Sequence, residues 1–193
     1  MLARLPRPWR IALDWVLTIV GAIVFVLVFE AEVAKPYRIP SASMEPTLRC
    51  AKPASDCTSR FSDRIIVNRL TYHFRAPKRG DIVVFHAPSS AATMCGAAGE
   101  YVKRVIGLPG DTVTEQSGTV LVNGHPLTEP YVTAAHRDQR SGSWGPIPDG
   151  RYFLLGDNRA ESCDSRTWGT VPRGDLVGPV VAVYWPPARL EIT

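Results

Sequence analysis

The hydrophobic residues fall into two patterns, one continuous run near the N-terminus and short separated runs after it. Residues 15–29 contain no charged side chain, and extending the run back to residue 11 adds only Asp14. At about 1.5 Å per residue, a helix over this stretch would match the hydrocarbon core of a bilayer, ~30 Å thick. The pattern therefore predicts one transmembrane helix over residues 11–30.

Arginines precede the apolar run at positions Arg4, Arg7 and Arg10. Positive charge on one flank of a membrane helix marks its cytoplasmic side. We therefore expect residues 1–10 to form a cytoplasmic tail and residues 31–193 to form a domain on the outer face of the membrane.

A cleaved signal peptide would have the same basic start and apolar middle. A small-x-small cleavage site should then follow the run. The triplets Phe29-Glu30-Ala31 and Glu32-Val33-Ala34 both place an unsuitable residue three positions before the cut. An uncleaved anchor is the better interpretation.

Beyond residue 30 the apolar residues come in short runs, and helical periodicity is nearly absent. Most of the 17 prolines and 15 glycines lie between these runs, where they supply turns. Asn123-Gly124 between two apolar runs is a strong hairpin signal. Segments 87–98 and 132–150 are rich in small and polar residues, which is typical of loops. The pattern predicts a mainly β, antiparallel domain with strands at 64–68, 81–85, 101–106, 119–122, 152–155 and 180–185.

The composition suits one globular domain and excludes general disorder, because 45% of the 193 residues are hydrophobic and 21% are charged. The net charge is only +4, and no basic run is interleaved with aromatic residues. A nucleic-acid partner is therefore not expected. A membrane-surface role fits some of the arginines better.

The four cysteines, Cys50, Cys57, Cys95 and Cys163, all lie on the side expected to be extracytoplasmic, where disulfides persist. Four cysteines allow three connectivities. Cys50 and Cys57 are the obvious local pair, which leaves Cys95 with Cys163, and free buried thiols remain the alternative. No CxxC motif is present and the histidines are scattered, so we predict no metal site.

Two segments carry residue types that can act together as nucleophile and base. Ser41 and Ser43 lie in a turn between prolines, and Lys103 lies in a strand-like apolar run. A serine hydroxyl becomes a good nucleophile when a base removes its proton, and a neutral lysine amine can do so. Strand alternation puts Tyr101, Lys103 and Val105 on one face, where burial would lower the pKa of the lysine. Alternation alone leaves open whether this face meets the core or the solvent.

A third segment, residues 156–169, is dense in charged and hydroxyl groups directly after an apolar strand. It is either a solvated loop or a buried polar network. In the second case the hydroxyl of Ser162 or Ser165 could hold the amine of Lys103 toward Ser43.

Four segments resemble the signature boxes of bacterial type I signal peptidases: PSASMEPTL, KRGDIVVF, YVKRVIGLPGD and GDNRAESCDSRTWG. The resemblance runs in the family's order over about residues 36–186. It implies a Ser-Lys serine endopeptidase of the bacterial cell membrane. Such an enzyme cleaves signal peptides from secretory preproteins after a small-x-small site, without a cofactor.

The resemblance assigns roles residue by residue. It implies that Ser43 is the nucleophile, Lys103 the general base, Ser41 the side-chain donor of the oxyanion hole and Ser162 the hydroxyl that orients the lysine. The walls of the shallow substrate pockets would be Tyr37, Ile39, Pro40, Met44 and Val102. The structural ion-pair partners near the site would be Arg104, Asp157, Asp164 and Arg166.

The resemblance also implies that the substrate lies extended against the edges near residues 37–41 and 100–103. Segment 111–150 is short for the family, which implies a small second β-subdomain. Cys163 stands where the family often has a small residue. A bridge from it to Cys95 would place a redox-sensitive link beside the catalytic centre.

Three other functions are compatible with parts of the sequence. A self-cleaving Ser-Lys repressor would need no bilayer anchor, and an inactive tethered relative would lack the serine or the lysine. An adhesion protein could use the Arg-Gly-Asp triplets at 79–81 and 173–175, although glycine turns before strands explain both.

Overall fold

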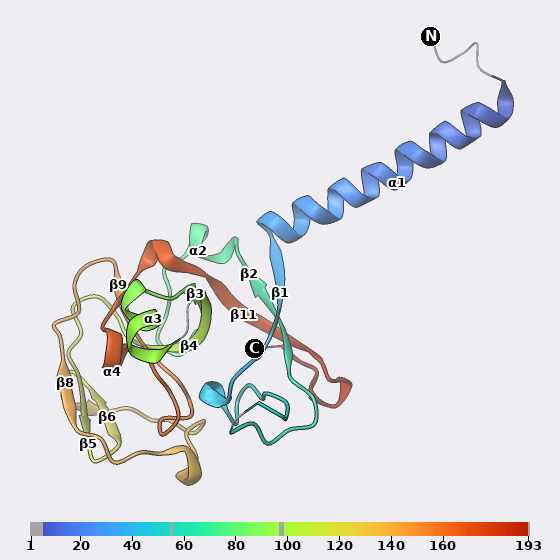
Figure 1. The fold of residues 1–193 in the computed structure, drawn as a ribbon. Helices are drawn as coiled ribbons and strands as arrows, with labels where there is room; N and C mark the ends of the chain where they lie inside the picture. The colour runs from blue at the N-terminus through green and yellow to red at the C-terminus, as the bar shows by residue number, and fades with distance from the viewer. Residues whose placement is uncertain (1–5, 55, 97–98, 193) are drawn as a thin grey trace.

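The computed structural model describes residues 6–54, 56–96 and 99–192, so Arg4 lies outside the described part (Figure 1). Helix α1 (Arg7–Glu32) projects from a mainly antiparallel β domain, which confirms the predicted fold class. Its apolar stretch, Pro8–Phe29, has 22 residues and a mean hydropathy of 2.6, and none of it is buried in the protein. By length and composition this helix can cross a bilayer.

The ends of α1 follow from its sequence. Pro8 lies in the first turn, where its missing N–H would have no partner in the helix. The last turn closes at Val33, whose N–H donates to the carbonyl of Phe29 at 2.8 Å. The chain then becomes extended before Pro36, as the residue before a proline favours. The helix begins earlier than the predicted boundary at residue 11.

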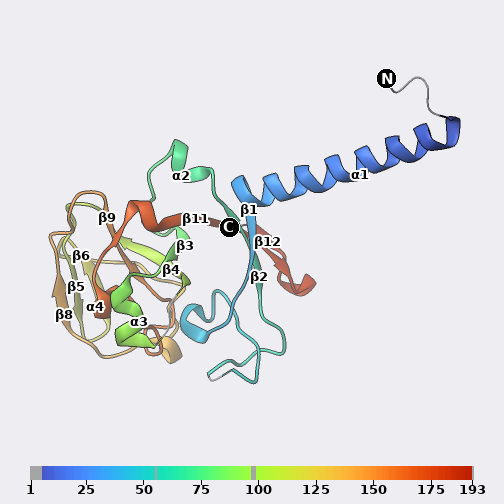
Figure 2. The same ribbon diagram turned by 45° about the horizontal axis from the view of Figure 1, so that its top comes forward.

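The β domain contains two antiparallel sheets. The larger has the order β1 (Ala34–Arg38), β2 (Arg64–Asn68), β11 (Leu176–Trp185), β3 (Ile82–His86), β4 (Glu100–Gly107), β9 (Arg151–Leu155) and β10 (Val171–Pro172), with β12 (Glu191–Ile192) beside β11. The smaller has the order β7 (His125–Pro126), β6 (Thr119–Val122), β5 (Val113–Gln116) and β8 (Gly142–Trp144). It lies on the far side of the domain from α1 (Figures 1 and 2).

Short helices fill the connections: α2 (Thr71–Phe74), α3 (Ser89–Cys95), α4 (Ser165–Trp168), and the 3₁₀ turns η2 (Ala42–Met44), η3 (Ala134–His136), η4 (Arg173–Asp175) and η5 (Pro187–Arg189). The predicted hairpin at Asn123-Gly124 joins β6 to β7, and both residues have positive φ, as a type I′ turn requires.

Two segments predicted as loops contain regular structure. Helix α3 lies within 87–98, because small helix-forming residues follow Pro88 and the helix ends at Gly96 with φ 67°. Seven residues are too few to show helical periodicity. Strand β8 and η3 lie within 132–150, where Trp144 of β8 packs on Phe153.

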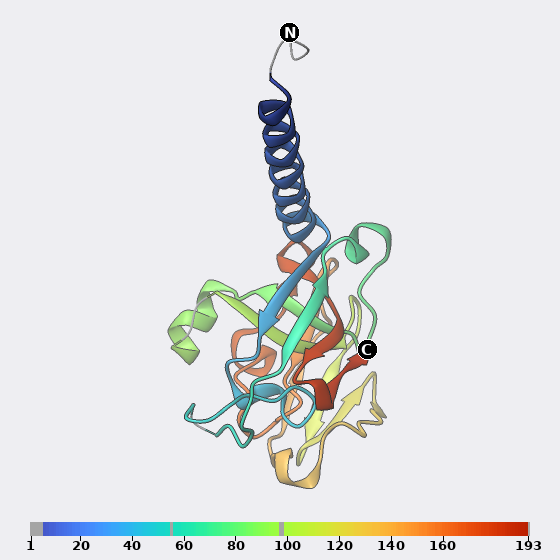
Figure 3. The ribbon, with the colours of Figure 1, turned by 90° about the vertical axis from the view of Figure 1, so that its right-hand side faces the viewer.

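One edge of the larger sheet meets the end of α1. Because neighbouring strands are antiparallel, the starts of β1, β4 and β11 and the ends of β2 and β3 lie there. The pairs Ala34–Asn68 and His86–Glu100 mark this edge. In Figure 3, β1 and β2 run side by side away from the base of α1. We call this end of the sheet, where these strand termini lie, the helix-proximal edge.

Candidate active site

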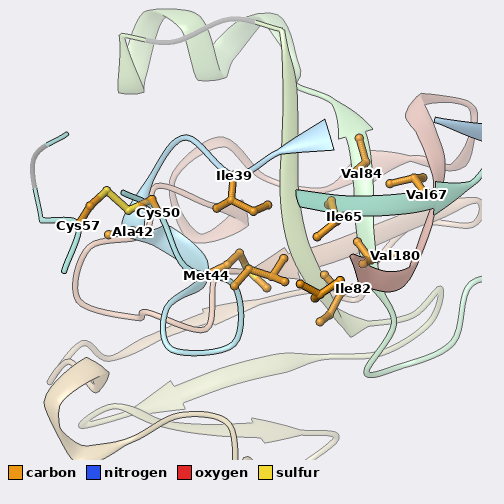
Figure 4. Packing of buried hydrophobic residues seen from close by; sticks show 12 residues of the cluster. Ile39, Ala42, Met44, Cys50, Cys57, Ile65, Val67, Ile82, Val84 and Val180 are labelled. Atoms are coloured by element: carbon orange, nitrogen blue, oxygen red, sulfur yellow. A yellow bond between two sulfur atoms is a disulfide. The ribbon is translucent and has the colours of Figure 1, made fainter. Parts of the chain in front are cut away.

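The turn η2 carries Ser43 and is held to the domain from two sides. Ala42 and Met44, on either side of the serine, are buried in a cluster with side chains of β2, β3 and β11 (Figure 4). The backbone N–H of Asn158 donates to the carbonyl of Ser43 at 3.1 Å, and its side-chain amide donates to the carbonyl of Ala42 at 3.2 Å. Apolar packing and these hydrogen bonds together fix the backbone at the serine.

Strand β4 brings Lys103 to this turn from 60 residues away in the sequence. Its amine donates to Ser43 Oγ at 2.6 Å, and the residue is only 2% exposed. Ser41 Oγ lies 3.3 Å from Ser43 Oγ, within hydrogen-bonding distance. The structure therefore places three of the predicted side chains in one chain of contacts.

Burial lowers the pKa of Lys103 from its ordinary value of 10.5 to about 8. The negative charges of Asp164 and Asp157 act in the opposite direction, and the charge of Arg166 adds to the lowering. Within the described part of the chain, Lys103 forms no salt bridge. Desolvation therefore prevails, and the amine loses its proton more readily than an ordinary lysine.

Arg104, the next residue of β4, forms a buried ion pair with Asp157. Its Nε and Nη2 donate to the two carboxylate oxygens at 2.8 and 2.5 Å, and Asp157 is fully buried. Thr47 Oγ1 donates to the same carboxylate at 2.5 Å, and Arg104 Nη1 donates to the carbonyl of Gly80 at 2.9 Å. Every charge in this group has a partner.

Asp164 and Arg166 form a second buried ion pair behind the site. Asp164 accepts from Arg166 Nε and Nη2, each at 2.9 Å, and from the backbone N–H of Gly156 at 3.1 Å. Arg166 also reaches Glu115 at 3.2 Å and Asp138 at 2.7 Å. These bonds connect the polar segment after β9 to the smaller sheet.

Ser162 is buried, but its Oγ has no hydrogen-bond partner among the described residues. It lies behind η2, because a Cβ added to Gly156 would come within 2.2 Å of Ser162 Oγ and 2.4 Å of the Ser43 carbonyl. Only glycine fits between them. The predicted hydrogen bond from Ser162 to Lys103 is not formed, and its orienting role stays a prediction.

A small cavity of about 80 Å³ opens beside Ser41 and Ser43. Such a volume admits a small side chain. All the residues predicted to form the substrate pockets line it: Tyr37, Ile39, Pro40, Met44 and Val102.

At the helix-proximal end of this cavity, three side chains join its two walls. Tyr37 of β1 donates from its hydroxyl to Glu100 of β4 at 3.0 Å, and the amine of Lys35 lies 3.4 Å from the same carboxylate. The Lys35 amine also lies 4.9 Å from the centre of the Tyr37 ring. We call Lys35, Tyr37 and Glu100 the Glu100 cluster.

Two disulfides flank the site. Cys50 pairs with Cys57 beside η2, and Cys95, at the end of α3, pairs with Cys163, which lies between Ser162 and Asp164. Among the residues that the structure describes, no cluster of side chains could hold a metal ion.

Comparisons with known proteins identify the family. The sequence pattern of "Signal peptidase, peptidase S26" matches residues 12–185. The chain belongs to this family. It is 40% identical to signal peptidase I of Leptolyngbya laminosa over 181 residues, covering 92% of this chain and 82% of the relative. It is 33% identical to signal peptidase IB of Staphylococcus aureus over 190 residues, covering 90% of each.

A solved signal peptidase I from Enterococcus faecalis is 31% identical, with a TM-score of 0.46, and the match covers 54% of this chain and 97% of that one. As a member of the signal peptidase I family, the chain is a serine endopeptidase that processes signal peptides.

Several residues around the signal peptidase site were not predicted from the sequence. Asn158 and Arg159 lie inside a segment that resembles a family box, so the resemblance could have indicated that they belong to the site. Arg159 is fully buried and pairs with Glu129 through both terminal nitrogens. Glu129, Glu115 and Asp138 lie in other segments with no local motif, and only the tertiary fold brings them here.

Proposed function

We propose that the chain is a membrane-bound signal peptidase that cleaves exported preproteins after a small-x-small site, with Ser43 as nucleophile and Lys103 as general base. One observation carries the proposal. An amine that is almost fully buried and has no carboxylate partner among the described residues lies 2.6 Å from a serine hydroxyl.

The lowered pKa supplies enough free amine for catalysis near neutral pH. With a pKa of about 8, roughly a quarter of the Lys103 side chains are neutral at pH 7.5, against ~0.1% for an ordinary lysine. The neutral amine takes the proton of Ser43 Oγ, which attacks the scissile carbonyl carbon. The resulting ammonium then protonates the leaving amine.

The tetrahedral intermediate carries a negative oxygen that needs hydrogen-bond donors. The hydroxyl of Ser41 and the backbone N–H of Ser43 are suitably close to the nucleophile. In other acyl-transfer enzymes, losing one such donor costs about 2.7–4 kcal/mol of transition-state stabilisation. Lys103, neutral again, activates the water that hydrolyses the acyl-enzyme.

Two strand edges support an extended substrate. Among the described strands, β1 is the last of its sheet, and β4 pairs with β9 only from Arg104 onward. A peptide strand placed between these edges would form main-chain hydrogen bonds with both. From Glu100 to Lys103 the strand advances three residues, about 10 Å. Roughly three substrate residues would thus separate the helix-proximal edge from the nucleophile.

Helix α1 supports membrane anchoring of the enzyme. In the proposed topology it is the single membrane span, residues 1–10 face the cytoplasm, and residues 31–193 form the outer domain. The substrate's own apolar segment would lie in the same bilayer, and its cleavage site would leave the membrane beside the helix-proximal edge. Confinement to one plane raises the effective concentration of enzyme and substrate.

The direct test is cleavage of a purified preprotein by the full chain, followed by sequencing of the new N-terminus. We expect a cut after a small-x-small site, and none with Ser43→Ala or Lys103→Met. Lys78→Met, at an exposed turn, is the matched control and should retain activity. Cleavage by Ser43→Ala would exclude the dyad, and cutting elsewhere would exclude the proposed substrate class.

A further inference from the structure

A second and larger cavity, of about 460 Å³, lies at the helix-proximal edge, outside the catalytic site. Its lining comes from the end of α1, the residue after β2, α2, the end of β3, η4 and the start of β11. Four of its side chains are arginine or histidine: Arg69, Arg173, His73 and His86. Glu32 is the only carboxylate in the lining.

The position of this cavity along α1 sets its depth relative to a bilayer. The apolar stretch of the helix ends at Phe29, and Glu32 lies about 4.5 Å further along the axis. The N–H of Arg69 donates to the carbonyl of Val33 at 2.9 Å, which ties the cavity to the helix end. If α1 spans the membrane, the cavity therefore lies at the level of the lipid headgroups.

The cationic groups of the cavity are available for an anion. Arg69 is half-buried, and its guanidinium has no hydrogen bond or ion pair within the described ranges. Arg173 uses one nitrogen, Nη2, for the carbonyls of Tyr72 and Arg75 at 2.8 and 3.4 Å. A partly desolvated charge without a counter-charge is costly, and a bound anion would relieve that cost.

An exposed aromatic side chain lies next to the cavity. Phe74 ends α2 and is 85% exposed, directly after His73 of the lining. Figures 1 and 3 show α2 on the side of the domain from which α1 emerges. An exposed aromatic beside basic residues is typical of segments that rest in the membrane interface.

We propose that this cavity binds the phosphate of an anionic phospholipid, with Arg69 and Arg173 as its cationic partners and Phe74 inserted among the acyl chains. The inference rests on the proposed anchoring of the enzyme by α1. With a second attachment besides the helix, the domain has a defined tilt. The Glu100 end of the substrate groove, at the same edge of the sheet, then faces the bilayer.

A fluorophore at position 74 tests the proposal in the full chain. The four native cysteines are all in disulfides, so a thiol-reactive fluorophore labels Phe74→Cys alone. The protein is placed in nanodiscs of phosphatidylcholine with increasing phosphatidylglycerol. We expect the emission to shift to the blue, and quenching by spin-labelled lipid to increase, as the anionic fraction rises.

Arg69→Gln in the labelled protein should weaken the association of position 74 with the anionic bilayer about fivefold, as expected for losing one arginine contact at a membrane surface, and so move the midpoint to a higher anionic fraction. Arg60→Gln is the matched control, because this exposed arginine precedes the opposite end of β2. Its midpoint should stay unchanged. Equal shifts in both variants would show attraction by overall charge and would overturn the site.

Two further outcomes separate the possible explanations. In detergent, glycerol 3-phosphate alone should leave the emission unchanged; a blue shift would assign the cavity to a soluble phosphate and overturn the lipid proposal.

Co-elution with nanodiscs tests α1 itself. Insertion without any response to phosphatidylglycerol overturns only this inference, whereas failure to insert overturns the anchor as well. Neither result bears on the Ser43–Lys103 chemistry.

Discussion

Two neighbouring residues of β4, Lys103 and Arg104, are both buried cations, yet their surroundings give them opposite properties. They are 2% and 9% exposed, respectively. Burial acts to lower the pKa of both side chains. At Arg104 the hydrogen bonds and charge of Asp157 outweigh burial and raise the pKa, whereas at Lys103 burial prevails. A contacting carboxylate therefore decides whether a buried cation of this strand keeps its proton.

The carboxylates near Lys103 are already occupied by arginines. Asp157 binds Arg104, and Asp164 binds Arg166. Both raise the pKa of Lys103 from a distance, but neither forms a salt bridge with its amine. The ion pairs behind the site thus leave the Lys103 amine without a direct counter-charge.

Lys103→Arg should have the largest effect, because it places an obligate cation where the structure has an ionisable amine. A guanidinium stays protonated at any working pH and cannot accept the serine proton. We expect kcat for preprotein cleavage to fall on the order of 10⁴-fold or more, about 5.5 kcal/mol, as for Lys103→Met. Single-turnover kinetics measure the loss. If Lys103→Arg kept a tenth of the activity, Lys103 could not be the base.

Asp157→Asn tests the other residue of the comparison. It would leave Arg104 buried with an uncompensated charge, which typically costs about 3–5 kcal/mol of stability. Arg75→Gln is the control, because the Arg75–Asp81 pair is partly exposed and should contribute at most about 1 kcal/mol. Denaturant unfolding in detergent measures both. Equal losses of stability would mean that the buried ion pair contributes no more than the partly exposed one.

The sequence predicted the strand that carries Lys103 but not the burial of its side chain. The β-branched run defined β4 nearly to its ends, and alternation placed Lys103 opposite Arg104. Both faces of β4 are buried from Lys103 to Gly107, and the contact that positions the Lys103 amine comes from η2, 60 residues earlier in the chain. Periodicity within one strand carries no information about such a distant contact, and only the family resemblance linked the two segments.

The ion-pair residues around the site also fall into two groups, those that the sequence indicated and those that it did not. Arg104, Asp157, Asp164 and Arg166 lie in segments that resemble family boxes, so they could be named from the sequence. Glu115 and Asp138, which pair with Arg166, and Glu129, which pairs with Arg159, come from the smaller sheet and its connections. Acidic residues on a strand or in a loop are ordinarily solvated, and nothing local indicates that these are buried. Strand β1 was missed because Pro36 weakens a strand pattern, although an edge strand tolerates proline.

The stability of the protein should depend on pH through Lys103. Its pKa is about 8 in the folded state and about 10.4 when unfolded, so the unfolded state binds more protons between these values. Stability should therefore rise with pH across that window, by roughly 3 kcal/mol, and the full cost of burial remains below pH 8. Lys103→Met should lack this rise and be the more stable protein at pH 7.

Unfolding at pH 7 and 9.5 for both proteins isolates the lysine, since other titrating groups are shared. The pH–rate profile of the wild type should rise through an apparent pKa near 8. Parallel stability curves for the two proteins would show that Lys103 is not desolvated in the folded state.

Glu100→Gln should have the smallest effect and extends the comparison to Lys35, a lysine that is only half-buried and is paired with a carboxylate. The neighbouring Tyr37 hydroxyl and the charge of Glu100 raise the pKa of Lys35, the opposite of the shift at Lys103. The substitution removes an exposed ion pair, worth at most about 1 kcal/mol, some 10 Å along β4 from the dyad. We therefore expect KM for the preprotein to rise about two- to fivefold with kcat unchanged.

Glu161→Gln, at an exposed carboxylate, should change neither constant. A tenfold fall in kcat for Glu100→Gln would instead mean that the Glu100 cluster sets the geometry of Ser43 and Lys103, and that the cluster and the dyad are not independent.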